Sequence, residues 1–216
     1  MHKSIDNLNL IKEDLKSKIN NYENVKVIAV SKTFPIETIM PLIEYGHLEY
    51  GENKVQEAIA KWTELKLAKP NIKLHLIGKL QTNKVKLALK LFDYIHSVDT
   101  KKLAKKIADE ELKQNKKIKI FLQVNIGDEE QKSGIKKDYL NDLYSYCKNL
   151  KLDIVGLMCI PPANIKSENF FKEMAILSKK LKLKELSMGM SSDYIEAAKN
   201  SASYIRIGSN IFGKRS

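Results

Sequence analysis

The chain of 216 residues is long enough for one large core and falls in the range of a single α/β barrel, although length alone does not exclude two domains. Its formal net charge is +12, but all except two of its 38 basic residues are lysines, and these lysines occur in every segment. A dedicated nucleic-acid binder would concentrate arginines and stacking aromatics on one face, so we expect no specific nucleic-acid partner, with weak polyanion affinity as an open alternative.

The cysteines and the apolar stretches indicate the compartment. Cys147 and Cys159 have neither metal-ligand spacing nor the density of a disulfide scaffold, which predicts small buried side chains in a reducing compartment. The amino-terminal residues mix charge with helical periodicity, which is unlike a signal peptide. No apolar run approaches the length of a membrane span, which is about 18 residues. We therefore expect a cytoplasmic protein without a membrane partner. A monomer is a separate expectation.

The chain begins with an amphipathic helix predicted over residues 3–22, after which short apolar runs alternate with longer amphipathic ones. This rhythm is typical of repeated βα units. The predicted strands are 25–31, 47–51, 73–78, 94–98, 118–125, 153–160, 185–189 and 204–208. The predicted helices between them include 35–46, 53–66, 100–113, 138–150 and 167–181, with Pro35, Thr100 and Ser167 as cap or first-turn residues.

Eight such strands predict a closed barrel. Residues 27–30 are apolar throughout, so their strand needs cover on both faces, as in a parallel sheet under helices. Eight parallel strands favour a (β/α)8 TIM barrel, and an open doubly wound sheet is the alternative. Only residues 209–216 follow the last strand, so either an abbreviated helix or the N-terminal helix would close the barrel. No linker divides the chain, and residues 1–216 are predicted as a single domain with an extra N-terminal helix.

Polar residues follow several predicted strands, at the end where barrels place their chemistry. The tails of the last two strands, "SMGMSSD" and "RIGSNIFG", are Gly/Ser turns that lead into helix starts. Backbone N–H groups and hydroxyls of two such turns would form an anion site, and barrels commonly bind phosphate between strands seven and eight. Either turn alone favours the simpler interpretation of a capped glycine turn, whereas the pair at these two strand ends favours a phosphate site.

Lys32 ends the first predicted strand, "VIAVSK". Residues 28, 30 and 32 share one side of a strand, so Lys32 points into the barrel mouth if Ile28 and Val30 fill the barrel. The alternative is a lysine that extends into solvent. In the mouth, partial desolvation and nearby cations would lower the pKa of the amine and suit it to attack a carbonyl. A lysine that faces a phosphate site in this way indicates a Schiff base with a phosphorylated aldehyde.

Arg206 lies in the last predicted strand of a chain that otherwise uses lysine almost throughout. If the aldehyde is pyridoxal 5'-phosphate (PLP), an arginine at the pyridine nitrogen would keep that nitrogen unprotonated and make the ring a weaker electron sink. A structural ion pair with a helix carboxylate is equally compatible with the sequence.

Several motifs occur in order from residue 27 to residue 215: "VIAVSKT", "GENKVQEA", "LIGKLQTNK", "IHSVD", "QVN" with "KSGI", "GLMCI", "LSMGMSSDYIEA" and "RIGSNIFGKR". On these motifs the chain resembles the pyridoxal phosphate homeostasis proteins, also called the YggS/PROSC family, which are similar to the barrel domain of alanine racemase without its β-rich second domain. The resemblance implies that Lys32 forms the Schiff base. It further implies the remaining cofactor-binding residues: Asn53 near the ring, Ser191, Gly208 and Ser209 at the phosphate, Arg206 at the pyridine nitrogen, and Ser187 and Met190 in the pocket lining.

The resemblance implies a PLP-binding protein that takes part in intracellular PLP (vitamin B6) homeostasis without established catalytic turnover, with PLP and apo PLP-dependent enzymes as partners. A PLP-dependent racemase is the alternative, although a racemase needs a second base opposite the Schiff base and the sequence offers no obvious one. Lys132 is a secondary aldehyde-reactive candidate, and Lys214 lies in a short C-terminal tail. Lys79 replaces a histidine usual in the family, and Thr82 replaces a common serine.

Overall fold

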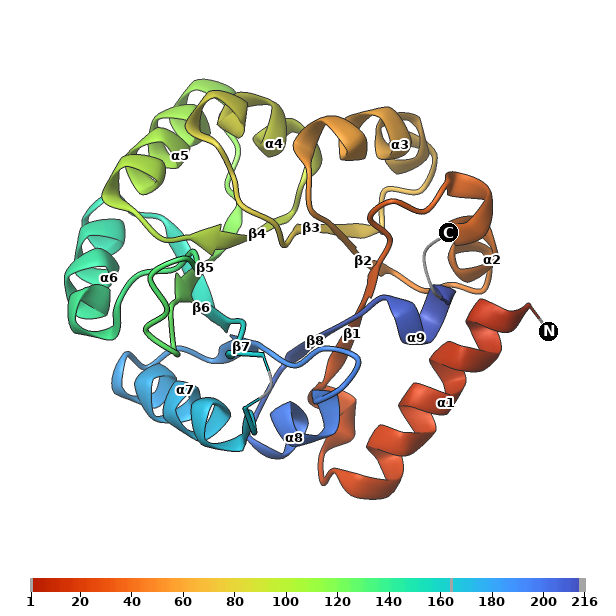
Figure 1. Ribbon diagram of the computed structural model, residues 1–216. Coiled ribbons are helices and arrows are strands. Elements are labelled where there is room, and N and C mark those ends of the chain that lie inside the picture. Colours follow the sequence, from red (N-terminus) through yellow and green to blue (C-terminus); the bar gives the residue numbers. More distant parts are fainter. Residues whose placement is uncertain (1, 164, 214–216) are drawn as a thin grey trace.

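The computed structural model describes residues 2–163 and 165–213, which form a closed barrel of eight parallel strands surrounded by helices (Figure 1). The strands follow chain order around the barrel, and β1 pairs in parallel with both β2 and β8. They are β1 (Lys26–Val30), β2 (Glu49–Glu52), β3 (Lys73–Leu76), β4 (Tyr94–Val98), β5 (Lys119–Val124), β6 (Asp153–Cys159), β7 (Glu185–Ser187) and β8 (Tyr204–Ile207). The predicted TIM barrel is confirmed, and the open doubly wound sheet is wrong.

The helices match the predicted ones with two additions. They are α1 (Lys3–Lys18), α2 (Ile36–Glu44), α3 (Val55–Ala68), α4 (Val85–Leu91), α5 (Lys101–Gln114), α6 (Leu140–Asn149), α7 (Glu168–Lys180), α8 (Tyr194–Lys199) and α9 (Ser209–Phe212), with 3-10 turns η1 (Tyr22–Asn24), η2 (Thr82–Lys84) and η3 (Lys137–Tyr139). The prediction did not name α4 and α8, because a helix of two turns or fewer gives little periodicity. Within residues 2–163 and 165–213, no helix combines the length and the apolar character needed to cross a bilayer.

Three helix ends are informative. The N-terminal helix ends at Lys18, four residues earlier than predicted, because Ile19 adopts an extended backbone and Asn21 a left-handed one. Thr100 caps α5 as predicted, since its hydroxyl accepts a hydrogen bond from the Leu103 N–H. Ser167 occupies the cap position of α7 without a side-chain hydrogen bond.

Both elements that were expected to close the barrel take part in its closure. In Figure 1, α1 lies outside the β1–β8 seam, alongside α9. The Asn7 amide donates to the Ile211 carbonyl at 2.9 Å, and the Tyr194 hydroxyl donates to Asp14 of α1 at 2.7 Å. The N-terminal helix therefore packs over the short last unit.

The side chains of β1 divide between two cores. Val27 and Ala29 pack outward in the large cluster beneath the helices. Ile28 and Val30 belong instead to a compact cluster inside the barrel, whose other buried members are Tyr94, Phe121, Met158 and Tyr204. The alternation predicted for β1 is therefore confirmed through Val30, the last residue of the strand.

Gly134, in the loop after β5, has a backbone conformation and surroundings that disfavour any side chain. Its φ is +120°, and an added Cβ would lie 2.6 Å from the Asn125 nitrogen and 2.8 Å from the Val124 carbonyl carbon. Strain and the backbone clash together should make Gly134→Ala lower the free energy of unfolding by about 2–4 kcal/mol. Gly46 is a matched control, because its φ is +94° and nothing lies within 4 Å of its added Cβ.

Urea denaturation of the two variants checks this prediction. Gly46→Ala carries only the backbone strain and should cost about 1–2 kcal/mol. Equal losses in the two variants would show that the contact with Asn125 and Val124 does not matter.

Candidate functional site

The predicted site residues come from four neighbouring strands, β7, β8, β1 and β2, and most lie at one rim of the barrel. Because all strands are parallel, their C-terminal ends meet at this rim, which we call the C-terminal rim. Lys32 and Asn53 follow β1 and β2; Met190 and Ser191 follow β7; Gly208 and Ser209 follow β8; Ser187 ends β7, and Arg206 lies within β8.

The two Gly/Ser turns meet directly. The Ser209 hydroxyl lies 3.2 Å from the Ser191 hydroxyl, and the Asn210 amide donates to the Ser191 carbonyl at 3.1 Å. Among the described residues, no acceptor is found for the backbone N–H groups of Ser191, Ser209 and Asn210. Gly208 presents no side chain here, and its added Cβ would lie 3.4 Å from Val30. These donors form a compact surface that suits an anion.

Lys32 lies in the turn that follows β1 and is half-buried. The turn is held on both sides of this lysine. The Ser31 N–H donates to the Gly51 carbonyl at 3.0 Å, and the Thr33 N–H donates to Glu57 of α3 at 2.5 Å. Thr33 has a left-handed backbone, with φ of 67°, which is uncommon for a β-branched residue. The protein therefore maintains a strained turn at the position of Lys32.

A buried carboxylate, Glu52, braces this turn from beneath. Its Oε1 accepts hydrogen bonds from the Ser31 hydroxyl at 2.8 Å and from Lys61 and Trp62 at 2.9 Å each. Lys61 also donates to the Ser31 carbonyl at 2.9 Å. The Glu52 side chain is 0% exposed and that of Lys61 is 9% exposed, so the ion pair is shielded from water. The residue before Lys32 is thereby tied to both β2 and α3.

Asn53 extends the same rim beside Lys32, because β1 and β2 are paired. The backbone after β3 approaches it closely. A Cβ added to Gly78 would lie 2.8 Å from the Asn53 Cα, so only glycine fits without a shift. The position of Asn53 therefore depends on its neighbours in "GEN" and on the glycine of "LIGK".

Arg206 points into the barrel and is 5% exposed. Its guanidinium donates to the Ser187 hydroxyl at 2.8 Å and to the Cys159 carbonyl at 2.9 Å. Within the part of the chain that the structure describes, it forms no ion pair with a carboxylate, so the predicted alternative of a structural ion pair with a helix is wrong. Burial lowers the pKa of Arg206, and the negative charge of nearby Asp193 partly offsets this effect. A buried cation without an ion pair suits a polar or anionic ligand.

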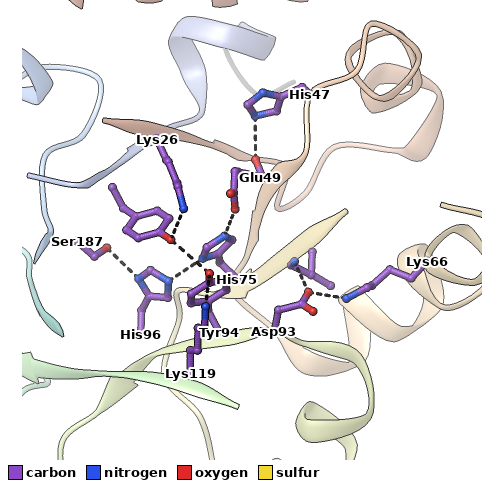
Figure 2. A network of polar contacts seen from close by, with 12 residues as sticks. Lys26, His47, Glu49, Lys66, His75, Asp93, Tyr94, His96, Lys119 and Ser187 are labelled. Carbon is purple, nitrogen blue, oxygen red and sulfur yellow. Dashed lines mark hydrogen bonds and ion pairs between the residues drawn. The ribbon is translucent and has the colours of Figure 1, made fainter. Parts of the chain in front are cut away.

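Sequence reasoning missed two buried histidines that extend this polar group down the barrel (Figure 2). His96 of β4 lies 2.9 Å from the Ser187 hydroxyl and 2.9 Å from His75 of β3, which in turn contacts Glu49 of β2 at 2.6 Å. The sequence feature that could have predicted them is a histidine at an inward position in each of two otherwise apolar strands, "KLHL" and "YIHSV". Such a histidine taken singly is more often a satisfied core residue.

The secondary lysines occupy separate places. Lys132 forms an ion pair with Glu129 at 2.6 Å and donates to the Pro161 carbonyl at 3.1 Å, so it ties two rim loops together. Lys79 is exposed near Asp99, whose pKa is raised by burial despite the Gly134 N–H and the Lys79 charge. Met190 is 37% exposed. Lys214 lies outside the described residues.

A cavity of about 760 Å³ lies at the opposite, N-terminal rim. None of the predicted site residues line it, and its walls include Lys18, Lys26, Glu185 and Ser203. The residues that the structure describes contain no group of three or more His, Cys, Asp or Glu side chains that could hold a metal ion. Cys147 and Cys159 are buried and free, as predicted. The clustered donors at the C-terminal rim, and not this cavity, match the predicted anion site.

The chain is similar to proteins of known family over almost its whole length. Residues 6–216 match the family described as "Alanine racemase, N-terminal domain". The "Pyridoxal phosphate homeostasis protein" of Haemophilus influenzae is 37% identical, covering 97% of this chain and 94% of that protein. The protein of the same name from Aquifex aeolicus is 38% identical, covering 88% of this chain and 87% of that protein.

Solved structures agree. PipY of Synechococcus elongatus, solved without PLP, has a TM-score of 0.85 at 35% identity and covers 93% of this chain and 97% of its own. PipY with PLP bound has a TM-score of 0.81 at 34% identity, with the same coverage. An alanine racemase of Clostridium difficile shares the fold, with a TM-score of 0.75 at 15% identity, and this chain covers 57% of it. The chain therefore belongs to the pyridoxal phosphate homeostasis proteins, within the alanine racemase N-terminal domain family.

Proposed function

We propose that this protein binds PLP at the C-terminal rim as a Schiff base with Lys32 and takes part in intracellular PLP homeostasis without catalytic turnover. The observation that carries the proposal is the meeting of the Ser191 and Ser209 turns on the rim that also holds Lys32. PipY, with 34% identity, has been solved with PLP bound, which supports the same ligand here.

Different residues of the site suit the phosphate, the pyridine nitrogen and the ring of PLP. The phosphate would take the N–H groups and hydroxyls of Ser191 and Ser209, with Gly208 leaving room for it. The pyridine nitrogen would accept a hydrogen bond from Arg206, a donor that cannot give up its proton to the ring at neutral pH. Asn53 and Met190 would border the ring. Ser187 is fully buried and bound to Arg206, so we infer that it acts through that arginine.

The covalent step needs only the lysine and the aldehyde. The Lys32 amine would condense with the aldehyde carbon, so that a C=N bond would replace the C=O bond and the oxygen would leave as water. PLP in general supplies an electron sink to amino-acid substrates. An unprotonated ring nitrogen beside Arg206 would weaken that sink, which favours holding the cofactor over turnover.

At least three of the nine tyrosine hydroxyls are engaged with other groups, which supports a carrier over a racemase. A racemase needs a second acid–base group on the opposite face of the Schiff base. Tyr94 and Tyr204 lie within hydrogen-bond distance of each other and of Lys119 and Lys26 respectively, at strand starts and away from the C-terminal rim. Tyr194 donates to Asp14 in α1.

We further propose apo PLP-dependent enzymes as recipients, and a monomeric cytoplasmic protein acting as one domain. Analytical ultracentrifugation of the purified protein tests the oligomeric state, and a dimer would contradict the proposed monomer. Transfer is tested by mixing the loaded protein with an apo PLP enzyme and following the recovery of that enzyme's activity.

The binding proposal is tested by titrating PLP into the purified apoprotein. The visible spectrum should change from that of free PLP to that of a protonated Schiff base, with a stoichiometry of one at saturation. Incubation of the saturated protein with single L-amino acids, followed by chiral analysis, should show no D-isomer. Formation of D-amino acid would instead support the racemase alternative, and an unchanged PLP spectrum would contradict PLP binding as a Schiff base.

A further inference from the structure

Five side chains form a continuous hydrogen-bonded line through the barrel, from the C-terminal rim toward the N-terminal rim. Arg206 Nη1 lies 2.8 Å from Ser187 Oγ, which lies 2.9 Å from His96 Nδ1. His96 Nε2 lies 2.9 Å from His75 Nδ1, and His75 Nε2 lies 2.6 Å from Glu49 Oε2. Figure 2 shows the line from Ser187 to Glu49. We call these residues the inner chain.

The donors and acceptors allow one direction for the whole inner chain. Arginine only donates, so Ser187 Oγ accepts from Arg206. An ionised Glu49 only accepts, so His75 donates from Nε2. A neutral His75 then accepts at Nδ1 from His96 Nε2–H, and a neutral His96 accepts at Nδ1 from the Ser187 hydroxyl. Every hydrogen bond in the inner chain points away from Arg206 and toward Glu49.

The surroundings keep both imidazoles neutral. His75 and His96 are 0% exposed, and burial lowers the pKa of each ring. For His96 the permanent charge of Arg206 acts in the same direction, and a proton on His75 would do so as well. Burial alone would raise the pKa of Glu49, but its hydrogen bond with His75 and the neighbouring positive charges outweigh this and lower it. A carboxylate acceptor and two neutral rings are the states that the single direction requires.

Stacking fixes the rings in their planes. His75 stacks on Tyr94 with centroids 4.3 Å apart and an interplanar angle of 10°, and His96 stacks on Phe121 at 4.2 Å and 23°. The nearby Lys26 and Lys119 direct their ammonium groups to the hydroxyls of Tyr204 and Tyr94. The imidazoles therefore have little freedom to exchange partners.

We propose that Glu49, His75 and His96 are positioning residues for the cofactor site, because through Ser187 they orient the guanidinium of Arg206 and make the Ser187 oxygen an acceptor for it. The inference rests on the proposed function at one point, the contact of Arg206 with PLP. The inner chain itself is independent of that contact.

The first test uses the apoprotein and needs no PLP. Nitrogen-15 spectra of the histidine side chains at neutral pH should show His75 and His96 both neutral and both carrying the proton on Nε2. An Nδ1–H tautomer or a protonated ring at either position would contradict the single direction. Variants at His75 and His96 assign the signals.

The second test compares two replacements of His96. Glutamine offers an oxygen for the Ser187 hydroxyl and an N–H group for His75, so His96→Gln should bind PLP within about threefold of the original protein. Leucine offers neither, so His96→Leu should bind PLP about tenfold to a hundredfold more weakly, as expected for a disturbed hydrogen bond to a charged group. Tyr94→Phe is the matched control, because it removes a hydroxyl beside the inner chain and keeps the stacked ring.

The same two His96 variants, made in a protein that also carries Arg206→Met, show whether their effect passes through Arg206. The difference between His96→Leu and His96→Gln should disappear there, because both act through Arg206. A difference that persists, or equal PLP affinity of the two variants with Arg206 present, would overturn the proposal. A protein that forms no Schiff base with PLP would overturn the proposed function instead, while the tautomer measurement still decides the inner chain.

Discussion

Replacing Lys32 with alanine is expected to abolish the visible band of the PLP-loaded protein. The lysine follows the inward-facing Ile28 and Val30 on β1, and its turn is held by hydrogen bonds at Ser31 and Thr33. PLP that is held only by its phosphate and ring contacts should show the spectrum of the free aldehyde and should be lost on dialysis. The measurement is the absorbance spectrum before and after dialysis.

Two other lysines in loops of this rim, Lys132 and Lys79, provide the controls for this prediction. Lys132 is engaged with Glu129 and Pro161, and Lys79 is exposed, so Lys132→Ala and Lys79→Ala should keep the full band. A full band in Lys32→Ala would assign the Schiff base to another lysine. Loss of the band in Lys132→Ala alone would point to the loop after β5.

The second large effect is expected at Glu52. Glu52→Gln keeps the shape of the side chain but takes from the buried Lys61 its closer carboxylate, at 2.9 Å, and leaves it with Glu57 at 3.6 Å. Removing one partner of a buried ion pair typically costs about 3–5 kcal/mol of unfolding free energy. Because Glu52 and Lys61 both hold Ser31, the PLP affinity should also fall. Urea denaturation and PLP titration of the same variant measure the two effects.

A second lysine of α3 provides the matched control. Lys66 pairs with Asp93 at 2.5 Å, and Asp93 also accepts from the Leu74 N–H, at the start of the strands and away from Lys32 (Figure 2). Asp93→Asn should lower stability less than Glu52→Gln, because this pair is more exposed, and should leave the PLP affinity unchanged. Equal losses of affinity in the two variants would show that Glu52 acts through general stability alone.

The barrel was predictable from sequence because its strands are buried on both faces and therefore read as short apolar runs. The strand boundaries agree within two residues of prediction, and the side to which Ile28 and Val30 point follows from simple alternation. The short helices α4 and α8 were not predicted, because they contain too few turns to show a helical periodicity of apolar residues. The predicted end of the N-terminal helix was wrong because the left-handed conformation at Asn21 carries no sequence signal as specific as a glycine.

The rim residues were predictable for a related reason. Lys32, Ser191 and Ser209 follow strands, and parallel strands bring such residues together whatever the details of packing. The Glu52–Lys61 pair was not predictable, because it joins a strand end to a helix face whose rotation is set by tertiary packing. The inner chain was missed because its members come from separate strands and become neighbours only when the barrel closes.

Borohydride reduction of the PLP-loaded protein, followed by mass mapping of the modified peptide, tests the central claim most directly. Reduction converts the C=N bond into a stable secondary amine and so records which lysine held PLP. The account predicts one PLP-derived adduct per chain, on Lys32. An adduct found mainly on Lys132, Lys79 or Lys214, with Lys32 unmodified, would contradict it.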